Sequence, residues 1–358
     1  MEATMAPQIS GVSLGMLIMD EIRMPNKAPL HNVIGGSSTF VTLGLRLFAS
    51  DPSSVGCLIL AGSDFPPSVE DEVRAWDTTL VLQKDATKRS SRGLLVYEDD
   101  TFGPKTFEYT TPPIRAAPGH LIDTPLLGAR AFHMFGRPEE VLVQVPELLR
   151  LRHSHDPSLP RPLIVWEPLP SSCHPSALPT FLSAMPLVDV FSPNHLELAA
   201  LFHPDSATTT LQHLANLGAA FLDARIGPDG NVHVPAFHAQ GSKEVVDPTG
   251  AGNAFLGGYM AGWLRAGGVA IDTYDNDPNT HANDSNTHNN ADADARTQKT
   301  LREALCCGAV AASFALEQIG LPRVERVSGL LGEARLGEFV ARLVGGVGES
   351  NSSSSGGS

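Results

Sequence analysis

The sequence contains few cysteines, few aromatic residues and no long hydrophobic run, and it carries fewer basic than acidic residues. Only four of the 358 residues are cysteines, Cys57, Cys173, Cys306 and Cys307. This spacing does not form a disulfide framework and is typical of a reducing compartment. Lys and Arg total 25 against 39 Asp and Glu, a net charge of −14, which argues against a nucleic-acid-binding surface. The longest apolar stretch, residues 254–264, is too short and glycine-rich to span a membrane.

The beginning of the sequence does not predict a secretory signal. Residues 1–10 contain no basic residue, and the apolar run 12–19 ends at Asp20, as expected for a strand. We therefore expect a cytoplasmic protein, and a nuclear location is also compatible with the sequence. We expect neither nucleic acid nor a membrane among its partners.

Apolar runs alternate with helix-like segments along most of the chain. Residues 126–135, 163–166 and 188–191 predict buried strands, and the alternation with helices indicates a parallel sheet covered on both faces. Residues 92–98 and 106–110, separated by a polar turn, predict a β-hairpin. The sequence therefore indicates an α/β protein with a separate hairpin.

Two segments are not expected to join the packed structure. Residues 272–299 are rich in Asn, Asp, Thr and His and contain almost no apolar side chain. Such a segment cannot bury enough surface to offset its ordering entropy, and we predict a disordered insertion. Residues 350–358 are Gly and Ser for the most part, which predicts a flexible tail.

The most informative segment is Asp247-Pro248-Thr249-Gly250-Ala251-Gly252-Asn253. A short extended stretch precedes it and helix-compatible apolar spacing follows, so the Gly-Ala-Gly run is predicted to begin a helix. The first N–H groups of a helix lack partners within the helix, and the helix dipole adds partial positive charge. The turn can therefore hold a phosphoryl group without a cation. The alternative is that the Gly-Ala-Gly turn only starts a helix.

Asn194 and Glu197 form a second candidate pair. They follow the predicted strand at 188–191 and stand one helical turn apart, so both side chains can face one site. There the carboxylate would organise Mg2+ and its waters. A capping box, in which the same two residues satisfy the first N–H groups of a helix, is the competing explanation. The position after the carboxyl end of a strand, where α/β sheets bind ligands, favours the functional interpretation.

These two motifs, and their order along the chain, resemble those of the PfkB (ribokinase-like) carbohydrate kinases. The glycine-rich segment is similar to the family signature D-T-x-G-A-G-D, and residues 194–197 fit its N-x-x-E motif. The resemblance covers residues 10–345. It implies a three-layer αβα ribokinase-like fold with a mostly parallel central sheet, and a small β lid formed by the hairpin at about 92–110. It also implies that ATP and Mg2+ are the cofactors, that the γ-phosphoryl group passes to a hydroxyl of a sugar, polyol or nucleoside, and that a homodimer through the lid is an option.

The resemblance further implies a role for each matching residue. The anion hole would be formed by Gly250, Ala251 and Gly252, with Asn253 at the position of the catalytic base. The nucleotide would be bound by Asn194, Glu197, Thr249, Gly227 and Gly230, with Glu197 also serving the metal. The acceptor would be bound by Asp20, Gly35, Gly36 and Asp247.

Two residues depart from the family pattern at the positions that handle the acceptor. Asn253 replaces the Asp that serves as base, and an amide cannot accept the proton as a carboxylate does. Phe40 stands where the family has an Asn that binds acceptor hydroxyls. Pro248 in place of Thr, together with Asn253, resembles a fungal branch of the family. Three interpretations stay open: a kinase with altered use of its base, a pseudokinase that senses nucleotide or sugar, and an interaction protein that binds neither.

Overall fold

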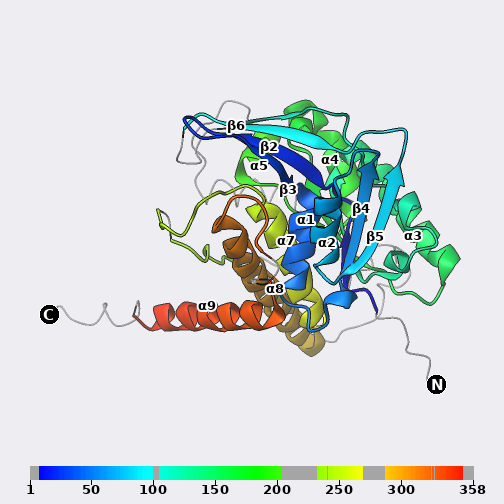
Figure 1. The fold of residues 1–358 in the computed structure, drawn as a ribbon. Helices are drawn as coiled ribbons and strands as arrows, with labels where there is room; N and C mark the ends of the chain where they lie inside the picture. The colour runs from blue at the N-terminus through cyan, green and yellow to red at the C-terminus, as the bar shows by residue number, and fades with distance from the viewer. Residues whose placement is uncertain are drawn as a thin grey trace, which may run out of the picture.

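A layer of parallel strands forms the centre of the molecule (Figure 1). The computed structural model describes residues 8–99, 105–202, 232–239, 241–268, 287–323, 325 and 327–349. The strands of this layer are β1 (Gly11–Ser13), β4 (Gly56–Gly62), β5 (Thr79–Asp85), β8 (Ala131–Gly136), β9 (Leu163–Pro168) and β10 (Val190–Phe191). Parallel pairing gives the orders β1-β8-β9-β10 and β4-β5, and a parallel bridge between Gly11 and Val55 joins β4 to β1. All carboxyl ends therefore meet at one edge.

Helices cover both faces of this layer. The helices are α1 (Ser37–Arg46), α2 (Pro67–Arg74), α3 (Pro138–His155), α4 (Leu178–Ala184), α5 (His195–Phe202), α7 (Ala251–Arg265), α8 (Thr287–Leu316) and α9 (Gly329–Glu349). Short 3-10 turns span Pro52–Ser54, Pro118–Leu121, Pro125–Gly128, Pro170–Ser172, Pro175–Ala177 and Met185–Leu187. Strand β9 illustrates the burial, because the adjacent side chains of Val165 and Trp166 point to opposite faces and both are fully buried.

The side chains on the two faces of β9 pack into different hydrophobic clusters. Trp166 packs in the cluster that includes Leu148 of α3 and Phe181 of α4, whereas Val165 packs with Leu45 of α1 and Met260 of α7. The sheet thus separates α3, α4 and α5 from α1, α7 and α8, and the predicted three-layer αβα architecture is confirmed. Within the described residues, none of the helices has the length and apolar character needed to cross a membrane.

A second sheet forms the predicted lid. Its strands are β2 (Ile18–Arg23), β3 (Leu30–Gly35), β6 (Arg92–Tyr97) and β7 (Lys105–Tyr109), in the order β3-β2-β6-β7. Strands β6 and β7 pair antiparallel, which confirms the predicted hairpin. Figure 1 shows this sheet beyond the ends of the central strands.

The position of Asp20 corrects one expectation. We expected the apolar run 12–19 to form one strand that ends at Asp20, but β1 ends at Ser13 and Asp20 lies inside β2 of the lid. The apolar run 12–19 is divided between two sheets at Gly15, where an added Cβ would lie 2.3 Å from the Ser37 hydroxyl. Periodicity alone does not reveal that the chain changes sheets within one apolar run.

Two predicted boundaries also need correction. The strand expected at 126–135 begins only at Ala131, because Pro125 starts a 3-10 turn that ends at Gly128. The insertion expected to be disordered at 272–299 is helical from Thr287 onward, as the start of α8. Residues 295–299 of α8 are exposed, and the helix continues from them without a break into its buried part, which begins at Thr300. A neighbouring core therefore supports a polar segment that has no apolar face of its own. The rest of the insertion, and the tail at 350–358, lie outside the described residues.

Candidate functional site

The glycine-rich segment forms a helix start with the geometry that its sequence predicts. Gly250 is the N-cap of α7 and has a φ of 79°, a left-handed conformation that favours glycine. An added Cβ on Gly250 would lie 2.3 Å from the ring of Phe40, whereas one on Gly252 would meet nothing within 4 Å. The N–H groups of the first turn can therefore approach an anion closely from the side of Gly252, and Phe40 closes the opposite side.

The buried carboxylate of Asp247 ties this helix start to the lid. Asp247 is 1% exposed, and its Oδ1 accepts hydrogen bonds from the Tyr97 hydroxyl at 2.9 Å and from the Thr249 N–H and Oγ1 at 2.9 and 2.7 Å. Lys105 Nζ lies 3.6 Å from the same oxygen and also donates to Thr249 Oγ1. Tyr97 and Lys105 belong to the lid hairpin. The lid therefore reaches the residues that precede the turn formed by Gly250, Ala251 and Gly252, which we call the cradle.

Asn253 lies in the first turn of α7 and contacts a carboxylate that the sequence did not indicate. Its Nδ2 donates to Glu167 Oε2 at 2.5 Å. Glu167 is at the carboxyl end of β9, and the same oxygen lies 3.0 Å from His133 Nε2. The position expected to hold a base is therefore one hydrogen bond away from a carboxylate on another element.

Asn194 and Glu197 adopt the capping-box geometry at the start of α5. Asn194 Oδ1 accepts from the N–H groups of Leu196 and Glu197 at 2.9 Å each, and Glu197 Oε2 accepts from the Asn194 N–H at 2.9 Å. Burial raises the pKa of Glu197 to about 7, a backbone hydrogen bond from Asn194 opposes that rise, and the charge of Glu167 adds to it. Asn194 and Glu197 therefore form a capping box. The buried carboxylate of Glu197 also lies close enough to that of Glu167 for their charges to interact.

Asp20, Gly35 and Gly36 come together where the lid meets α1. An added Cβ on Gly35 would lie 2.3 Å from Asp20 Oδ2, and one on Gly93 would lie 2.3 Å from Asp20 Oδ1. Among the described residues Asp20 Oδ1 has no hydrogen-bond partner although it is buried, and burial raises the Asp20 pKa to about 7. Gly36 has a φ of 95° and lies against the Met16 carbonyl, so no side chain fits there.

The structure thus brings most of the predicted site residues to one edge of the sheet. Gly227 and Gly230, predicted for the nucleotide side, lie outside the described residues. Sequence reasoning did not identify Ser13, Tyr97, Lys105, His133 or Glu167. The only signal for Glu167 in the sequence was its position at the end of a buried strand, where ligand-binding residues of α/β sheets occur.

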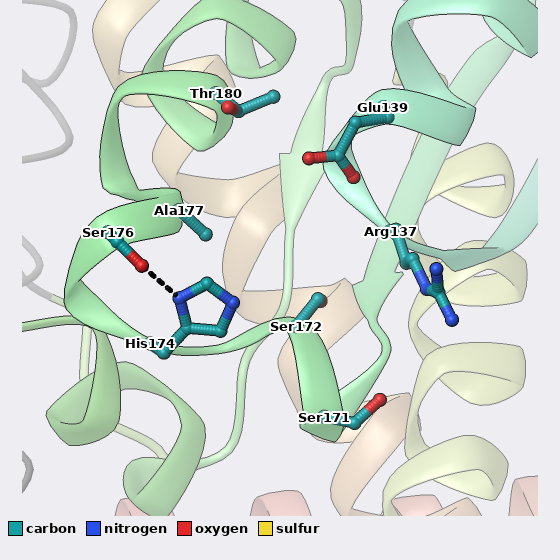
Figure 2. Close-up of a pocket in the computed structure, with 8 residues that line it drawn as sticks. All are labelled: Arg137, Glu139, Ser171, Ser172, His174, Ser176, Ala177 and Thr180. Atoms are coloured by element: carbon teal, nitrogen blue, oxygen red, sulfur yellow. Dashed lines mark hydrogen bonds between the residues drawn. The ribbon is translucent and has the colours of Figure 1, made fainter.

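Two open hollows lie near these elements. One, of about 130 Å3, is lined by lid residues that include Asp20, His31 and Gly93. The other, of about 450 Å3, lies after the carboxyl ends of β8 and β9 and is lined by polar side chains. Figure 2 shows the Glu139 carboxylate turned toward the segment that carries His174. None of the residues predicted from the sequence lines this larger hollow.

Comparison with known proteins agrees with this geometry. The profile described as pfkB family carbohydrate kinase matches residues 144–323, half of the chain. An uncharacterised protein of Schizosaccharomyces pombe is 28% identical over 349 residues, covering 87% of this chain and 85% of that protein. The solved structure of ribokinase from Giardia lamblia matches with a TM-score of 0.63 at 14% identity, covering 93% and 99% of the two chains. Fructokinase with bound ATP from Xylella fastidiosa matches with a TM-score of 0.62 at 16% identity, covering 92% and 98%.

The two structural matches cover 93% and 92% of this chain. The structural likeness establishes the ribokinase-like fold, and the profile match covers both the residues 194–197 and the segment 247–253. This chain belongs to the pfkB family of carbohydrate kinases.

Proposed function

We propose that this protein transfers the γ-phosphoryl group of ATP to a hydroxyl group of a small polyhydroxylated molecule, a sugar, polyol or nucleoside. The observation that carries the proposal is the open cradle at the start of α7, which stands beside a buried carboxylate and beneath a lid that reaches it. A loose phosphoryl-transfer transition state depends mainly on positioning and on stabilising charge. The N–H groups of the first helical turn can supply that stabilisation, apart from that of Ala251, which donates to the Pro248 carbonyl at 3.3 Å.

The nucleotide side is supported by Thr249, Glu197 and Asn194. The Giardia and Xylella neighbours are named as kinases, and the Xylella structure holds ATP, which supports ATP as the phosphoryl donor here. Glu197 supplies hard oxygen ligands, which suit Mg2+ held through its waters and the nucleotide phosphates. Within the described residues no group of three metal ligands occurs, so the phosphates would complete the coordination. When bound, Mg2+ would neutralise phosphate charge.

The acceptor side is supported by Asp20. A buried carboxylate oxygen without a partner costs free energy, and a hydroxyl donor from the acceptor would satisfy it. The absence of side chains at Gly35 and Gly93 makes room for the Asp20 carboxylate, because an added Cβ at either position would lie 2.3 Å from one of its oxygens. Phe107 and Tyr109 of β7 remain 46% and 39% exposed on the lid, and their rings meet edge to face at a centroid distance of 5.0 Å. An acceptor with both hydroxyls and an apolar face fits this composition.

A second candidate function is a pseudokinase that binds nucleotide or sugar without transferring phosphate. Two residues, Asn253 and Phe40, favour it. An amide at position 253 cannot take up the acceptor's proton. Phe40 is 2% exposed and packs with Ala254 and Ala315, so its position offers no polar group to an acceptor.

Two measurements on the full chain separate these functions. Calorimetry with MgATP and MgADP tests the nucleotide side, and we expect binding that is weakened by Gly252→Asp, because a carboxylate would then occupy the phosphate position. A single-turnover phosphoryl-transfer screen over ribose, fructose, glycerol and adenosine tests the chemistry. Binding with transfer supports the kinase, and binding without transfer supports the pseudokinase. No nucleotide binding at millimolar concentration would reject the kinase and a nucleotide-binding pseudokinase, and would leave only a pseudokinase that binds sugar.

A further inference from the structure

Glu167 occupies a position beside the cradle that the rest of the site does not explain. It stands at the carboxyl end of β9, next to last in that strand, and its side chain is 20% exposed. Its Oε2 is 2.5 Å from the amide nitrogen of Asn253, in the first turn of α7. The carboxylate is therefore both accessible and adjacent to the turn proposed to hold the phosphoryl group.

The two donors that hold Glu167 use the same oxygen. Asn253 Nδ2 and His133 Nε2 both contact Oε2, the latter at 3.0 Å. Neither hydrogen bond involves Oε1, so the carboxylate is fixed in orientation while its second oxygen keeps its accepting capacity. This arrangement differs from that of Glu197, which uses both oxygens to accept from Asn194.

A buried chain of hydrogen bonds lies behind Glu167. Ser13 Oγ lies 2.8 Å from His133 Nδ1, and Ser13 Oγ also accepts from the Gly15 N–H at 3.0 Å. Because the Glu167 carboxylate can only accept, His133 Nε2 donates to it, while Nδ1 faces the Ser13 hydroxyl. The order Ser, His, Glu is also that of a hydrolase triad, but Ser13 is 1% exposed and His133 is fully buried, so no substrate reaches the hydroxyl. The series of hydrogen bonds from Ser13 through His133 instead orients the Glu167 carboxylate.

We propose that Glu167 is the base of the phosphoryl transfer, replacing the carboxylate that residue 253 lacks. The inference rests on the proposed kinase function. In the step, the acceptor hydroxyl oxygen forms a bond to the γ-phosphorus while the bond from that phosphorus to the β,γ-bridging oxygen breaks, and ADP leaves with the bonding electron pair. The hydroxyl proton passes to Glu167 Oε1. Asn253 and His133 position the carboxylate, and Glu197 is a second carboxylate whose charge interacts with it.

An exchange of the two side chains tests this assignment. Glu167→Gln removes the carboxylate with little change of shape, and loss of a general base typically costs about 10²–10⁴-fold in rate. The double variant E167Q/N253D transfers the carboxylate from position 167 to position 253, whose side chain is its hydrogen-bonded neighbour. In that variant the amide at position 167 can donate to the carboxylate at position 253 and accept from His133, so every partner stays satisfied. We expect Glu167→Gln to lower the rate of phosphoryl transfer by about 10²–10⁴-fold. The double variant should transfer at least about tenfold faster than Glu167→Gln.

The measurement is single-turnover transfer from MgATP to the acceptor that wild type uses best, with melting temperature and MgADP affinity recorded for every variant. Glu338→Gln, an exposed change on α9, is the matched control and should match wild type. Full activity in Glu167→Gln would overturn the assignment. A loss that the exchange fails to rescue, in a folded protein that binds MgADP, would overturn it as well, because Glu167 would then only support its neighbours. Absence of transfer by wild type to every acceptor would instead reject the proposed function itself.

Discussion

The hydroxyl of Tyr97, on the lid hairpin, donates a 2.9 Å hydrogen bond to the buried carboxylate of Asp247, 150 residues later in the chain. Burial raises the pKa of Tyr97, with the charge of Asp247 adding to that rise and a hydrogen bond from Thr249 opposing it. Tyr97 therefore stays a protonated donor. The bond connects the lid to the segment that begins the cradle, so lid and cradle are expected to be coupled energetically.

Tyr97→Phe should destabilise the protein by about 1–3 kcal/mol, because a hydrogen bond to a buried charged group is lost and Asp247 keeps fewer donors. Urea unfolding measures the change. Tyr109→Phe is the control on the same hairpin, since the Tyr109 ring is 39% exposed, and it should change stability by less than about 0.5 kcal/mol. Equal effects of the two substitutions would show that the bond to Asp247 contributes little.

The raised pKa of Asp20 predicts a pH dependence of stability. The Asp20 pKa is about 7 in the folded protein against an ordinary value of 3.8, so between these values the folded state binds more protons than the unfolded state. Stability should therefore fall as pH rises from about 4 to about 7, by an amount on the order of a few kcal/mol. Glu197, with a folded pKa also of about 7, contributes in the same window.

Asp20→Asn should remove the Asp20 share of this slope and raise the melting temperature at pH 8. Thermal unfolding across pH 4–8 measures both effects, and the share of Glu197 should remain in the variant. An unchanged slope would mean that Asp20 is not protonated in the folded protein at neutral pH.

Gly250 and Gly252 form a matched pair for testing the cradle. Gly250→Ala places a side chain at a φ of 79° and directly against Phe40, and left-handed backbone alone costs about 1–2 kcal/mol. Gly252→Ala lies inside α7 with free space around it, so stability should stay equal or rise by up to about 1 kcal/mol. Chemical unfolding of both variants checks the difference, and a neutral Gly250→Ala would contradict the observed backbone conformation.

Deleting residues 275–284 should leave stability and nucleotide binding nearly unchanged, because that stretch has no apolar face and loop length affects closure entropy only weakly. Ala304→Asp is the contrasting change, since Ala304 is fully buried in α8 and a charge there has no partner. Thermal unfolding of both variants tests this, and only Ala304→Asp should lower the melting temperature strongly. A large fall in the melting temperature of the deletion protein would show that the deleted stretch contributes to the packed structure.

Features that depend only on neighbouring residues could be predicted from the sequence. The helix start at Ala251 follows from the glycines before it and the apolar spacing after it, and the capping geometry of Asn194 and Glu197 follows from their three-residue separation. The lid hairpin follows from two alternating segments around a polar turn. Each of these signals is local, so reading the chain in order is sufficient to find it.

Contacts between residues far apart in the chain could not be predicted in this way, because they depend on how the elements pack. Glu167 contacts Asn253 because β9 and α7 pack together, and no pattern in either segment indicates the other. The same holds for Asp20, whose strand belongs to the lid because the chain changes sheets near Gly15. The helical start of α8 within a polar stretch depends on a buried continuation that supplies its stability. These contacts are set by packing between elements far apart in the sequence, and that information is absent from local composition and spacing.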